Sequence, residues 1–410
     1  MMKILKYLLV IIAITCAALL LFYSEKLKNL SDQIASKPYD ARSIMSPNMA
    51  IQDSTARLDF STEARNKEVS YEVKEIALGL FVPWSIAFTS ENRALITERN
   101  GVIREMVNDI IGKNQLIKFN DVKTSSEEGL MGLAVDPDYA TNKYLYVCYA
   151  YNGSNGLADK LVRLIDKETT IEVDKTLLDE IPAASNHAGC RVKFGPDGFL
   201  YVTTGDATDK NIAQEIKSLG GKILRLNKDG TPTSDSPFEN SFVYSYGHRN
   251  PQGIDWTEEG LLLESEHGPS GFDGPPGGDE INLIRAGGNY GWPMVSHEKT
   301  NPKYQTPLQV FTPAIAPGSL MVYKADLIPQ FKGKVFIGGL KGEGLYVISF
   351  ENNSYKKVSD VSKIAEVNFG RIREVVQAPN GEIYFTTSNR DGRGTLRDAD
   401  DRIYKITVKE

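Results

Sequence analysis

The stretch NHAGCRVKFGPDGFLYVTTGD, residues 186–206, decides the fold of this chain. It contains an apolar segment, a turn of Gly, Pro, Asp and Gly, and then a run rich in Tyr, Val and Thr. This pattern predicts two antiparallel strands joined by a tight turn. Related units recur along the chain after residue 69, and we count six of them.

Each unit combines an apolar segment with one or more alternating strands, and no convincing helix lies between the units. The units are marked by residues 84–98, 130–147, 186–226, 251–284, 334–348 and 383–406. One small sheet cannot bury both of its faces alone, whereas sheets packed radially cover one another. The repeats therefore predict an all-β fold, a six-bladed β-propeller, closed by an early strand near residues 71–78. A two-sheet sandwich is the alternative, but a single sandwich rarely uses so many strands.

The composition is that of a globular protein, with 41% hydrophobic and 24% charged residues. The formal net charge of -6 provides no field that would attract a polyanion. The chain also lacks a run of Lys and Arg interleaved with aromatic residues, which nucleic-acid binders need. These features argue against binding to DNA or RNA.

The N-terminal segment predicts that the propeller lies outside the cytoplasm. Lys3 and Lys6 precede an apolar stretch at residues 8–23, which is typical of an export signal or an uncleaved membrane anchor. No small-residue cleavage site follows the stretch, so we favour the anchor. We expect a signal or anchor at 1–24, a polar linker at 25–68 and a propeller domain at 69–410, on the periplasmic or extracellular face of a membrane.

Two of the three cysteines lie in the predicted propeller. In an oxidising compartment Cys148 and Cys190 could form a disulfide if the fold brings them together. The other interpretation, which we favour, is a pair of buried free thiols.

Only four histidines occur, and His187, at the start of the strand-turn-strand unit, is the best catalytic candidate. The first strand of each propeller blade lines a central channel, so polar residues that precede these strands can converge at one mouth. The candidates are Glu127, Glu128, Arg191, Asp206, Arg249, Asn250, His267, Lys341, Arg371 and Arg373. For any one of them, a solvated loop charge or a hydrogen bond between blades is the simpler interpretation.

Several of the candidates are fixed cations. Arg249, Lys341, Arg371 and Arg373 together suit a small polyanion, because guanidinium groups match carboxylates bidentately. No zinc-ligand spacing, nucleophile elbow or dinucleotide-binding glycine fingerprint is present in the sequence.

The loop that begins at Gly268 and Pro269 is rich in glycine and oxygen ligands. Asp273, Asp279 and Glu280 follow in the same loop. Calcium prefers such oxygen ligands, so a calcium site is one interpretation. A turn with exposed acidic residues is the other.

Taken together, these motifs resemble those of the soluble, pyrroloquinoline quinone (PQQ)-dependent glucose and aldose sugar dehydrogenases, which are six-bladed propellers. The resemblance covers about residues 73–407. It rests on NHAG (186–189), GD (205–206), GHRNPQG (247–253), HGP (267–269), GDEIN (278–282), GGNYGWP (287–293), AIAP (314–317), LKG (340–342) and RIR (371–373). Each stretch alone is a weak signal, and the combination is specific.

The resemblance implies that His187 acts as general base on the anomeric hydroxyl of an aldose while hydride passes from that carbon to the quinone, giving a lactone. It implies that Arg249 stabilises charge on the reacting quinone oxygen and that Asp206 orients His187. The electron acceptor stays open.

The resemblance also implies which residues bind the cofactor and the metal. The residues implied to bind PQQ are Glu127, Asn250, Lys341, Arg371 and Arg373. The main-chain carbonyls of Gly268 and Pro269 are implied at a catalytic calcium ion, and Glu280 with the Tyr290 carbonyl at a structural one.

Three features depart from the family pattern. Glu127 stands where glucose-oxidising members have glutamine, and Thr312 stands where they have tryptophan. Loss of that aromatic side chain removes a stacking surface for sugar, so it affects the substrate more than the cofactor. Extra residues at 271–277 could cap the mouth of the channel or add an oxygen ligand to the metal.

Two other functions fit a propeller. A lactonase would use calcium and a histidine to activate water, but it would not need Lys341, Arg371 and Arg373 directed at one ligand. A binding propeller without activity is the other possibility, because the animal Hedgehog-interacting proteins keep this scaffold as a partner-binding module. The presence of His187, Arg249 and Asp206 together favours an enzyme.

Overall fold

The computed structural model of the chain describes residues 68–409. The predicted signal or anchor at 1–24 lies outside the described residues, as does the predicted linker at 25–68 except for Glu68. Within 68–409, no helix is both long enough and apolar enough to span a membrane.

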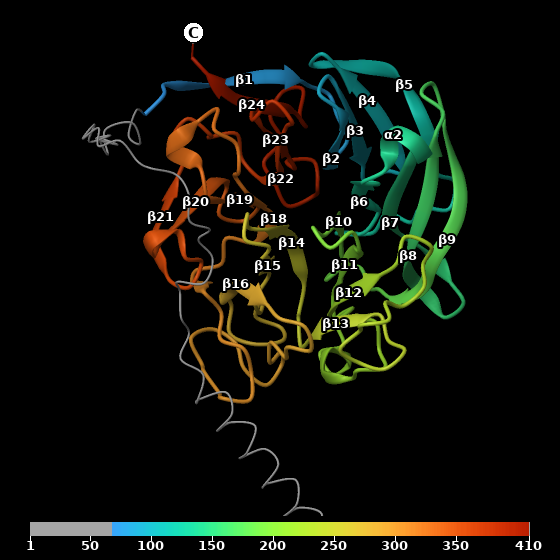
Figure 1. Ribbon diagram of the computed structural model, residues 1–410, viewed down its shortest axis with the longest axis vertical. Coiled ribbons are helices and arrows are strands. Elements are labelled where there is room, and N and C mark those ends of the chain that lie inside the picture. The colour runs from blue at the N-terminus through green and yellow to red at the C-terminus, as the bar shows by residue number, and fades with distance from the viewer. Residues whose placement is uncertain (1–67, 410) are drawn as a thin grey trace, which may run out of the picture. The chain divides into compact units, whose positions relative to one another are not determined.

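The described chain forms six four-stranded antiparallel sheets arranged around a common centre (Figure 1). The first three sheets are β2 (Pro83–Ser90), β3 (Arg93–Glu98), β4 (Val102–Val107), β5 (Ile110–Lys118); β6 (Leu130–Val135), β7 (Tyr144–Gly153), β8 (Gly156–Asp166), β9 (Ile171–Pro182); and β10 (Gly189–Phe194), β11 (Leu200–Thr204), β12 (Lys222–Leu226), β13 (Val243–Tyr246). The last three are β14 (Pro251–Trp256), β15 (Leu262–Glu266), β16 (Asp279–Ile284), β17 (Gln309–Phe311); β18 (Pro317–Val322), β19 (Val335–Gly339), β20 (Gly344–Phe350), β21 (Val358–Lys363); and β22 (Ile372–Gln377), β23 (Ile383–Thr387), β24 (Ile403–Val408) with β1 (Tyr71–Ala77). Helical turns are short: α2 (Tyr139–Asn142), η2 (Ile212–Gln214), η3 (Pro329–Phe331) and η4 (Glu351–Asn353).

The ring closes because β1 pairs antiparallel with β24, so the two ends of the described chain share one sheet (Figure 1). Tyr71 lies opposite Val408 and Ala77 lies opposite Ile403. The innermost strands are β2, β6, β10, β14, β18 and β22. Each contacts the innermost strand of the next sheet, and β22 contacts β2. The predicted six-bladed propeller, closed by an early strand, is therefore confirmed.

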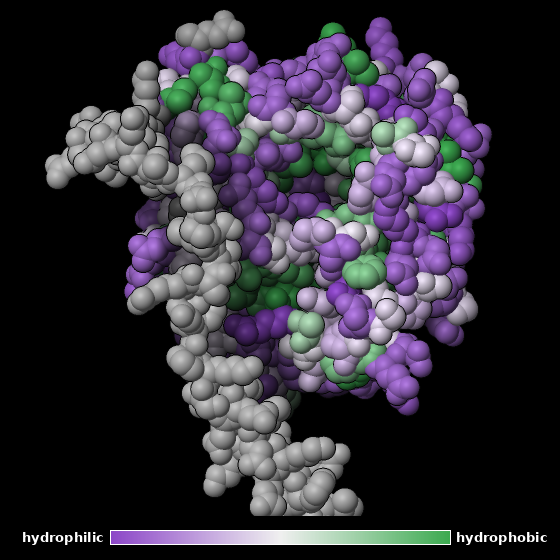
Figure 2. Space-filling model, viewed as in Figure 1, coloured by the Kyte–Doolittle hydropathy of each residue, from purple (hydrophilic) through white to green (hydrophobic). Residues whose placement is uncertain are grey.

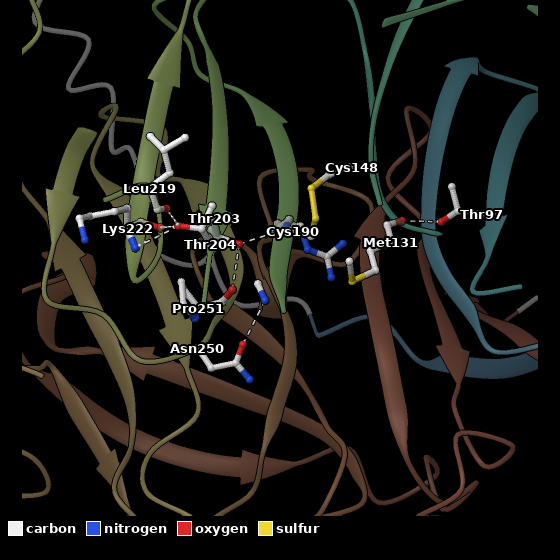
Figure 3. The surroundings of a disulfide bond; sticks show 12 residues. Thr97, Met131, Cys148, Cys190, Thr203, Thr204, Leu219, Lys222, Asn250 and Pro251 are labelled. Atoms are coloured by element: carbon white, nitrogen blue, oxygen red, sulfur yellow. Dashed lines mark hydrogen bonds between the residues drawn. A yellow bond between two sulfur atoms is a disulfide. The ribbon is translucent and has the colours of Figure 1, made fainter. Parts of the chain in front are cut away.

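Buried threonine hydroxyls link neighbouring sheets at equivalent positions. Each lies on the second strand of its sheet and donates to a backbone carbonyl on the first strand of the next. The three bonds are Thr97 to Met131 at 2.7 Å, Thr203 to Pro251 at 2.8 Å and Thr386 to Pro83 at 2.9 Å, and Figure 3 draws the first two. A buried hydroxyl without a partner costs about 1–3 kcal/mol, so these bonds favour one alignment of the sheets.

The apolar core consists of layers between neighbouring sheets. The layer between the second and third sheets contains Met131, Tyr146, Val192, Val202 and Leu224, and all of these side chains are buried. In Figure 2, hydrophilic residues predominate on the face in view, and hydrophobic residues gather near its hollowed centre. Because packing between sheets supplies the stability, the loops at the ends of the ring are free to carry polar residues.

A disulfide joins Cys148 on β7 to Cys190 on β10 and so links the second sheet to the third (Figure 3). The two Cα atoms lie 5.5 Å apart, and both side chains are buried. Our preference for two free thiols is therefore wrong. β10 packs against β7 of the neighbouring sheet, and this contact between sheets is what brings the two sulfur atoms together.

Removal of the disulfide should destabilise the propeller. The cysteines are 42 residues apart, and closing such a loop restricts the unfolded chain by about 4 kcal/mol in the chain-entropy model. We expect the Cys148→Ala/Cys190→Ala variant to lose about 2–4 kcal/mol in the free energy of unfolding, measured by urea denaturation. A reductant should bring the wild type to a similar midpoint and leave the variant unchanged. An unchanged wild-type midpoint under reductant would contradict a stabilising disulfide.

Candidate active site

A cavity of about 430 Å³ is enclosed by loops that precede the innermost strands and by loops that join the second and third strands of a sheet. Eight of the twelve residues to which the resemblance assigns a role line it: Glu127, His187, Arg249, Gly268, Pro269, Lys341, Arg371 and Arg373. They come from several different sheets, because the closed ring brings these loops to one end. The other four of the twelve, Asp206, Asn250, Glu280 and Tyr290, are not part of this lining. Of the further candidates, His267 lines the cavity, and Glu128 and Arg191 do not.

His187 is held at its backbone and at its ring. Its backbone N–H donates to Oε2 of Glu127 at 2.9 Å, and its Nδ1 lies 2.6 Å from Oδ1 of Asp206. Gly205 packs against it so closely that a Cβ atom there would lie 1.7 Å from the His187 carbonyl oxygen, so a side chain is excluded. The bond to Asp206 leaves Nε2 as the available ring nitrogen, and no described residue forms a hydrogen bond with it.

Asp206 is itself fixed from three sides. Its Oδ2 accepts a hydrogen bond from Nε1 of Trp292 at 2.8 Å, and its Oδ1 accepts one from the backbone N–H of Thr208 at 2.9 Å. The backbone N–H of Asp206 donates to the Arg249 carbonyl at 2.8 Å. The carboxylate can therefore hold the imidazole in one orientation and one tautomer.

The other histidines are engaged elsewhere or lie away from the cavity. His267 lines the cavity, but its Nε2 lies 3.0 Å from the Pro317 carbonyl oxygen, and burial lowers its pKa to about 4. His248 is buried between the Ser245 hydroxyl and the Glu266 carboxylate. His297 does not line the cavity. His187 is thus the best placed of the four to accept a proton there.

Glu127 links the base to the rim of the cavity. Its Oε1 lies 2.6 Å from Nη1 of Arg393, and its Oε2 accepts the His187 N–H. Burial would raise the pKa of this carboxyl group, but the adjacent positive charge and these bonds outweigh that effect and lower the pKa to about 2. Glu127 is therefore a carboxylate at neutral pH.

Arg249 is buried and is held by the extended loop that follows Gly268. Its Nε donates to Oδ2 of Asp273 at 2.7 Å, and its Nη2 donates to the Ser270 hydroxyl at 3.0 Å. Phe272, next to Asp273, lines the cavity. The extra residues at 271–277 therefore border the mouth of the cavity and contact one of its cations.

Positive charge predominates in the cavity lining. The cations are Arg99, Arg249, Lys341, Arg371, Arg373 and Arg393, and the carboxylates are Glu127, Asp279 and Asp391. Asp273, which pairs with Arg249, adds one more negative charge at the mouth. An excess of cations remains, so the cavity suits a small ligand with several negative charges.

The cations differ in how well they are paired. Arg371 pairs with Asp391 at 2.7 Å, whereas the Lys341 ammonium has no side-chain partner among the described residues. Arg373 donates from Nη1 to Gln252, but its buried Nε has no partner in the described chain. Burial lowers the pKa of Arg373 to about 9. Lys341 and Arg373 are thus the cations best able to take an external partner.

Asn250 lies behind the cavity wall. Its Oδ1 accepts hydrogen bonds from the Gly189 N–H at 3.1 Å and from Nε2 of Gln252 at 2.9 Å. Its Nδ2 lies 3.4 Å from Oε2 of Glu127. In this arrangement Asn250 positions the residues around His187, and its side chain does not reach the cavity.

The predicted calcium ligands on the cavity wall are two carbonyl groups. The Pro269 carbonyl accepts the Gly277 N–H at 3.1 Å, and the Gly268 carbonyl accepts no hydrogen bond from the described residues. Asp279 fixes this loop, because its Oδ1 accepts the Gly268 N–H at 2.8 Å and its Oδ2 accepts the Ile315 N–H at 2.7 Å. The two carbonyl groups therefore belong to a rigid part of the wall.

Glu280 belongs to a buried carboxylate cluster beside the cavity. Ligand atoms of His248, Glu264 and Glu266 lie within 4.8 Å of one another, and Glu280 shares the Asn282 amide with both glutamates. Oε1 of Glu264 and Oδ1 of Asn282 are buried and have no partner within the described chain. Burial and the nearby Glu266 raise the pKa values of Glu264 and Glu280. Such a donor set fits a hard cation such as calcium.

Tyr290 adjoins this cluster through its ring and lines a small second cavity with Glu280. The ring stacks on His248 with a centroid distance of 4.6 Å, and the hydroxyl donates to the Leu283 carbonyl at 2.7 Å. Its position is therefore compatible with a backbone ligand at a metal beside Glu280.

Sequence reasoning did not assign several residues of the cavity. Arg99, Phe272, Asp391 and Arg393 line it, and Trp292 supports Asp206. Trp292 was visible within the GGNYGWP stretch, and Phe272 within the extra residues at 271–277. The Arg393 contact with Glu127 spans 266 positions in the sequence, and no local pattern marks it.

The chain is similar to known sugar dehydrogenases. The family model described as Glucose / Sorbosone dehydrogenase matches residues 80–397. The aldose sugar dehydrogenase YliI of Escherichia coli is 31% identical over 339 residues, which cover 76% of this chain and 88% of that protein. Quinoprotein glucose dehydrogenase B of Acinetobacter calcoaceticus is 31% identical over 288 residues, or 59% of this chain and 56% of that protein.

A solved structure agrees with these matches. The PQQ-bound form of aldose sugar dehydrogenase from Streptomyces coelicolor superposes with a TM-score of 0.74 at 32% sequence identity, covering 83% of this chain and 99% of that one. The family match spans strands β2 to β23 and all of the residues that enclose the cavity, and only the closing strands β1 and β24 of the described propeller lie outside it. The predicted family is therefore confirmed, and the chain belongs to the glucose/sorbosone dehydrogenase family.

Proposed function

We propose that the protein is a PQQ- and calcium-dependent dehydrogenase that oxidises the anomeric C–OH group of an aldose to a lactone. One observation carries the proposal: His187 presents Nε2 to a cavity rich in cations, while Asp206 holds its Nδ1 at 2.6 Å. Relatives named as aldose sugar and quinoprotein glucose dehydrogenases support the same reaction class.

The role of His187 is to accept the hydroxyl proton of the sugar at Nε2. Asp206 stabilises the imidazolium ion that forms, because its carboxylate is already bonded to Nδ1. When bound, PQQ supplies a two-electron acceptor for the hydride that leaves the anomeric carbon. Arg249 lines the cavity together with His187 and provides a fixed positive charge there.

The cofactor fits the donor set of the cavity. PQQ carries three carboxylates, and the excess of cations in the lining suits such a ligand. Lys341 and the unpartnered Nε of Arg373 would hold carboxylate or carbonyl oxygens, and Arg371 would assist them. Glu127 and Asn250 would support the site indirectly, because they accept hydrogen bonds from the backbone of the loop that carries His187.

Two calcium positions form part of the proposal. The carbonyls of Gly268 and Pro269 would bind one ion at the cavity wall. Glu280, the Tyr290 carbonyl and the unpartnered oxygen of Glu264 would bind a second ion, which stabilises the fold. Carbonyl and carboxylate oxygens are the ligands that calcium prefers.

The proposed location is the periplasmic or extracellular face of a membrane, with residues 1–24 as signal or anchor and 25–68 as linker. The buried disulfide supports an oxidising compartment, because such bonds are rare in the reducing cytosol. A lactonase or a binding propeller is less well supported, since neither needs the paired arrangement of His187 and Asp206 beside unpartnered cations.

Loss of His187 should abolish turnover without loss of cofactor. We expect His187→Ala, reconstituted with PQQ and calcium, to oxidise aldoses about 100- to 10,000-fold more slowly, because a general base contributes that range. Dye reduction measures turnover, and the absorption spectrum measures bound quinone. His297→Ala is the matched control and should retain activity. Equal rates for the wild type and His187→Ala would rule out this base.

Loss of Lys341 should weaken cofactor binding. The ammonium group has no side-chain partner in the described chain, so Lys341→Ala should disturb the fold little while removing a bond to a charged ligand. We expect the Kd for PQQ to rise about 10- to 100-fold, more at low than at high salt, in an absorbance titration. Lys356→Ala, an exposed lysine outside the cavity lining, is the control. Unchanged affinity in Lys341→Ala would exclude this contact.

Calcium should stabilise the protein through the buried carboxylate cluster even without quinone. A ligand at 100 times its Kd stabilises by about 2.7 kcal/mol, which corresponds here to a rise in Tm of roughly 4 °C. Glu264→Gln should remove most of that rise, because the neutral amide keeps the shape and loses the charge. Thermal denaturation with added calcium and with a chelator measures this rise in Tm. An equal rise in wild type and variant would contradict a metal at this cluster.

A further inference from the structure

Phe272 is a large apolar side chain left in solvent at the mouth of the candidate active site. It is 67% exposed, although it also lines the cavity. Burial of a phenylalanine side chain is worth about 1.5–3 kcal/mol, so a ligand that covered this ring would gain binding energy from it.

The loop around Phe272 is ordered by specific contacts. Asp273 accepts the Ser270 N–H at 3.0 Å and the Arg249 Nε–H at 2.7 Å. The Gly271 N–H donates to the Gly274 carbonyl at 3.1 Å, and the Gly277 N–H donates to the Pro269 carbonyl at 3.1 Å. These bonds close the loop on itself and fasten it to a buried cation, so the backbone that carries Phe272 is held in place.

The Phe272 ring lies directly beside the proposed base. Its centroid is 5.8 Å from that of the His187 imidazole, and the two planes differ by 22°. The Arg249 guanidinium carbon lies 6.0 Å from the same ring. A molecule bound at the His187 ring would therefore lie close to Phe272.

Thr312, which is not aromatic, contacts the end of this loop. Its hydroxyl accepts the Gly278 N–H at 3.1 Å, and a Cβ atom on Gly277 would lie 3.0 Å from its methyl group. Among the residues that line the cavity, Phe272 is the one aromatic carbocycle, and the remainder are mainly charged or small. Sugar rings carry apolar C–H faces, and binding sites for such ligands combine aromatic surface with a few polar groups.

We propose that Phe272 is the specificity-determining residue for the sugar, and that the extra residues at 271–277 present its ring to the apolar face of an aldopyranose. This inference rests on the proposed dehydrogenase function and deepens it. Asp273 acts as a positioning residue, because its bond to Arg249 fixes the loop. The ring contributes binding surface and does not take part in the proton transfer.

The test compares Phe272→Ala, Phe272→Trp and Phe81→Ala, each reconstituted with PQQ and calcium. Phe81 is also exposed, at 38%, and does not line the cavity, so Phe81→Ala is the matched control. We expect Phe272→Ala to raise KM for aldopyranoses about tenfold, with little change in kcat, because uniform binding energy is lost. Phe272→Trp should restore KM, and the PQQ affinity should be equal in all three variants.

The outcomes separate this inference from the function on which it rests. An active Phe272→Ala enzyme with wild-type KM overturns the role of Phe272 and leaves the dehydrogenase intact. A fall in kcat at unchanged KM also overturns it, because the ring would then act on His187. If the wild type binds PQQ but oxidises no aldose, both the function and the sugar contact are wrong.

Discussion

Closure of the ring is the constraint on which the rest of the structure depends. β1 pairs with β24, and Thr386 on the last sheet donates to Pro83 on the first, so each innermost strand has a neighbour on both sides. The starts of these strands must then meet at one end. Residues as distant in sequence as Glu127 and Arg393 come within hydrogen-bond distance for this reason.

Because the closed ring brings these residues to one end, it also places groups of like charge close together. Cations outnumber carboxylates in the cavity lining, and beside it Glu264, Glu266 and Glu280 crowd together, with the buried Oε1 of Glu264 unpaired within the described chain. Buried charges without partners destabilise a fold, because the interior screens them poorly. Both features become favourable once ligands of opposite charge are present, an anionic cofactor in the first case and a divalent cation in the second. The same physical argument therefore points to two different ligands.

Much of the fold could be predicted from the sequence, because each sheet repeats an apolar strand and a turn. The resemblance implied that Asp206 orients His187, and the two residues meet because one precedes β10 and the other follows β11. Contacts between sheets could not be predicted in this way. The Cys148–Cys190 bond, Asn250 behind the wall and the Arg249–Asp273 pair all depend on how neighbouring sheets or long loops pack. Local patterns carry no information on such distances.

The central claim is that cations from separate sheets hold a quinone within reach of His187. The most direct measurement is a crystal structure of the protein grown with PQQ and calcium. The account predicts quinone density in the cavity, with its carboxylates on Lys341 and Arg373 and open space beside Nε2 of His187 for a sugar. Quinone bound elsewhere, or a cavity that stays without quinone at saturating PQQ, would contradict it.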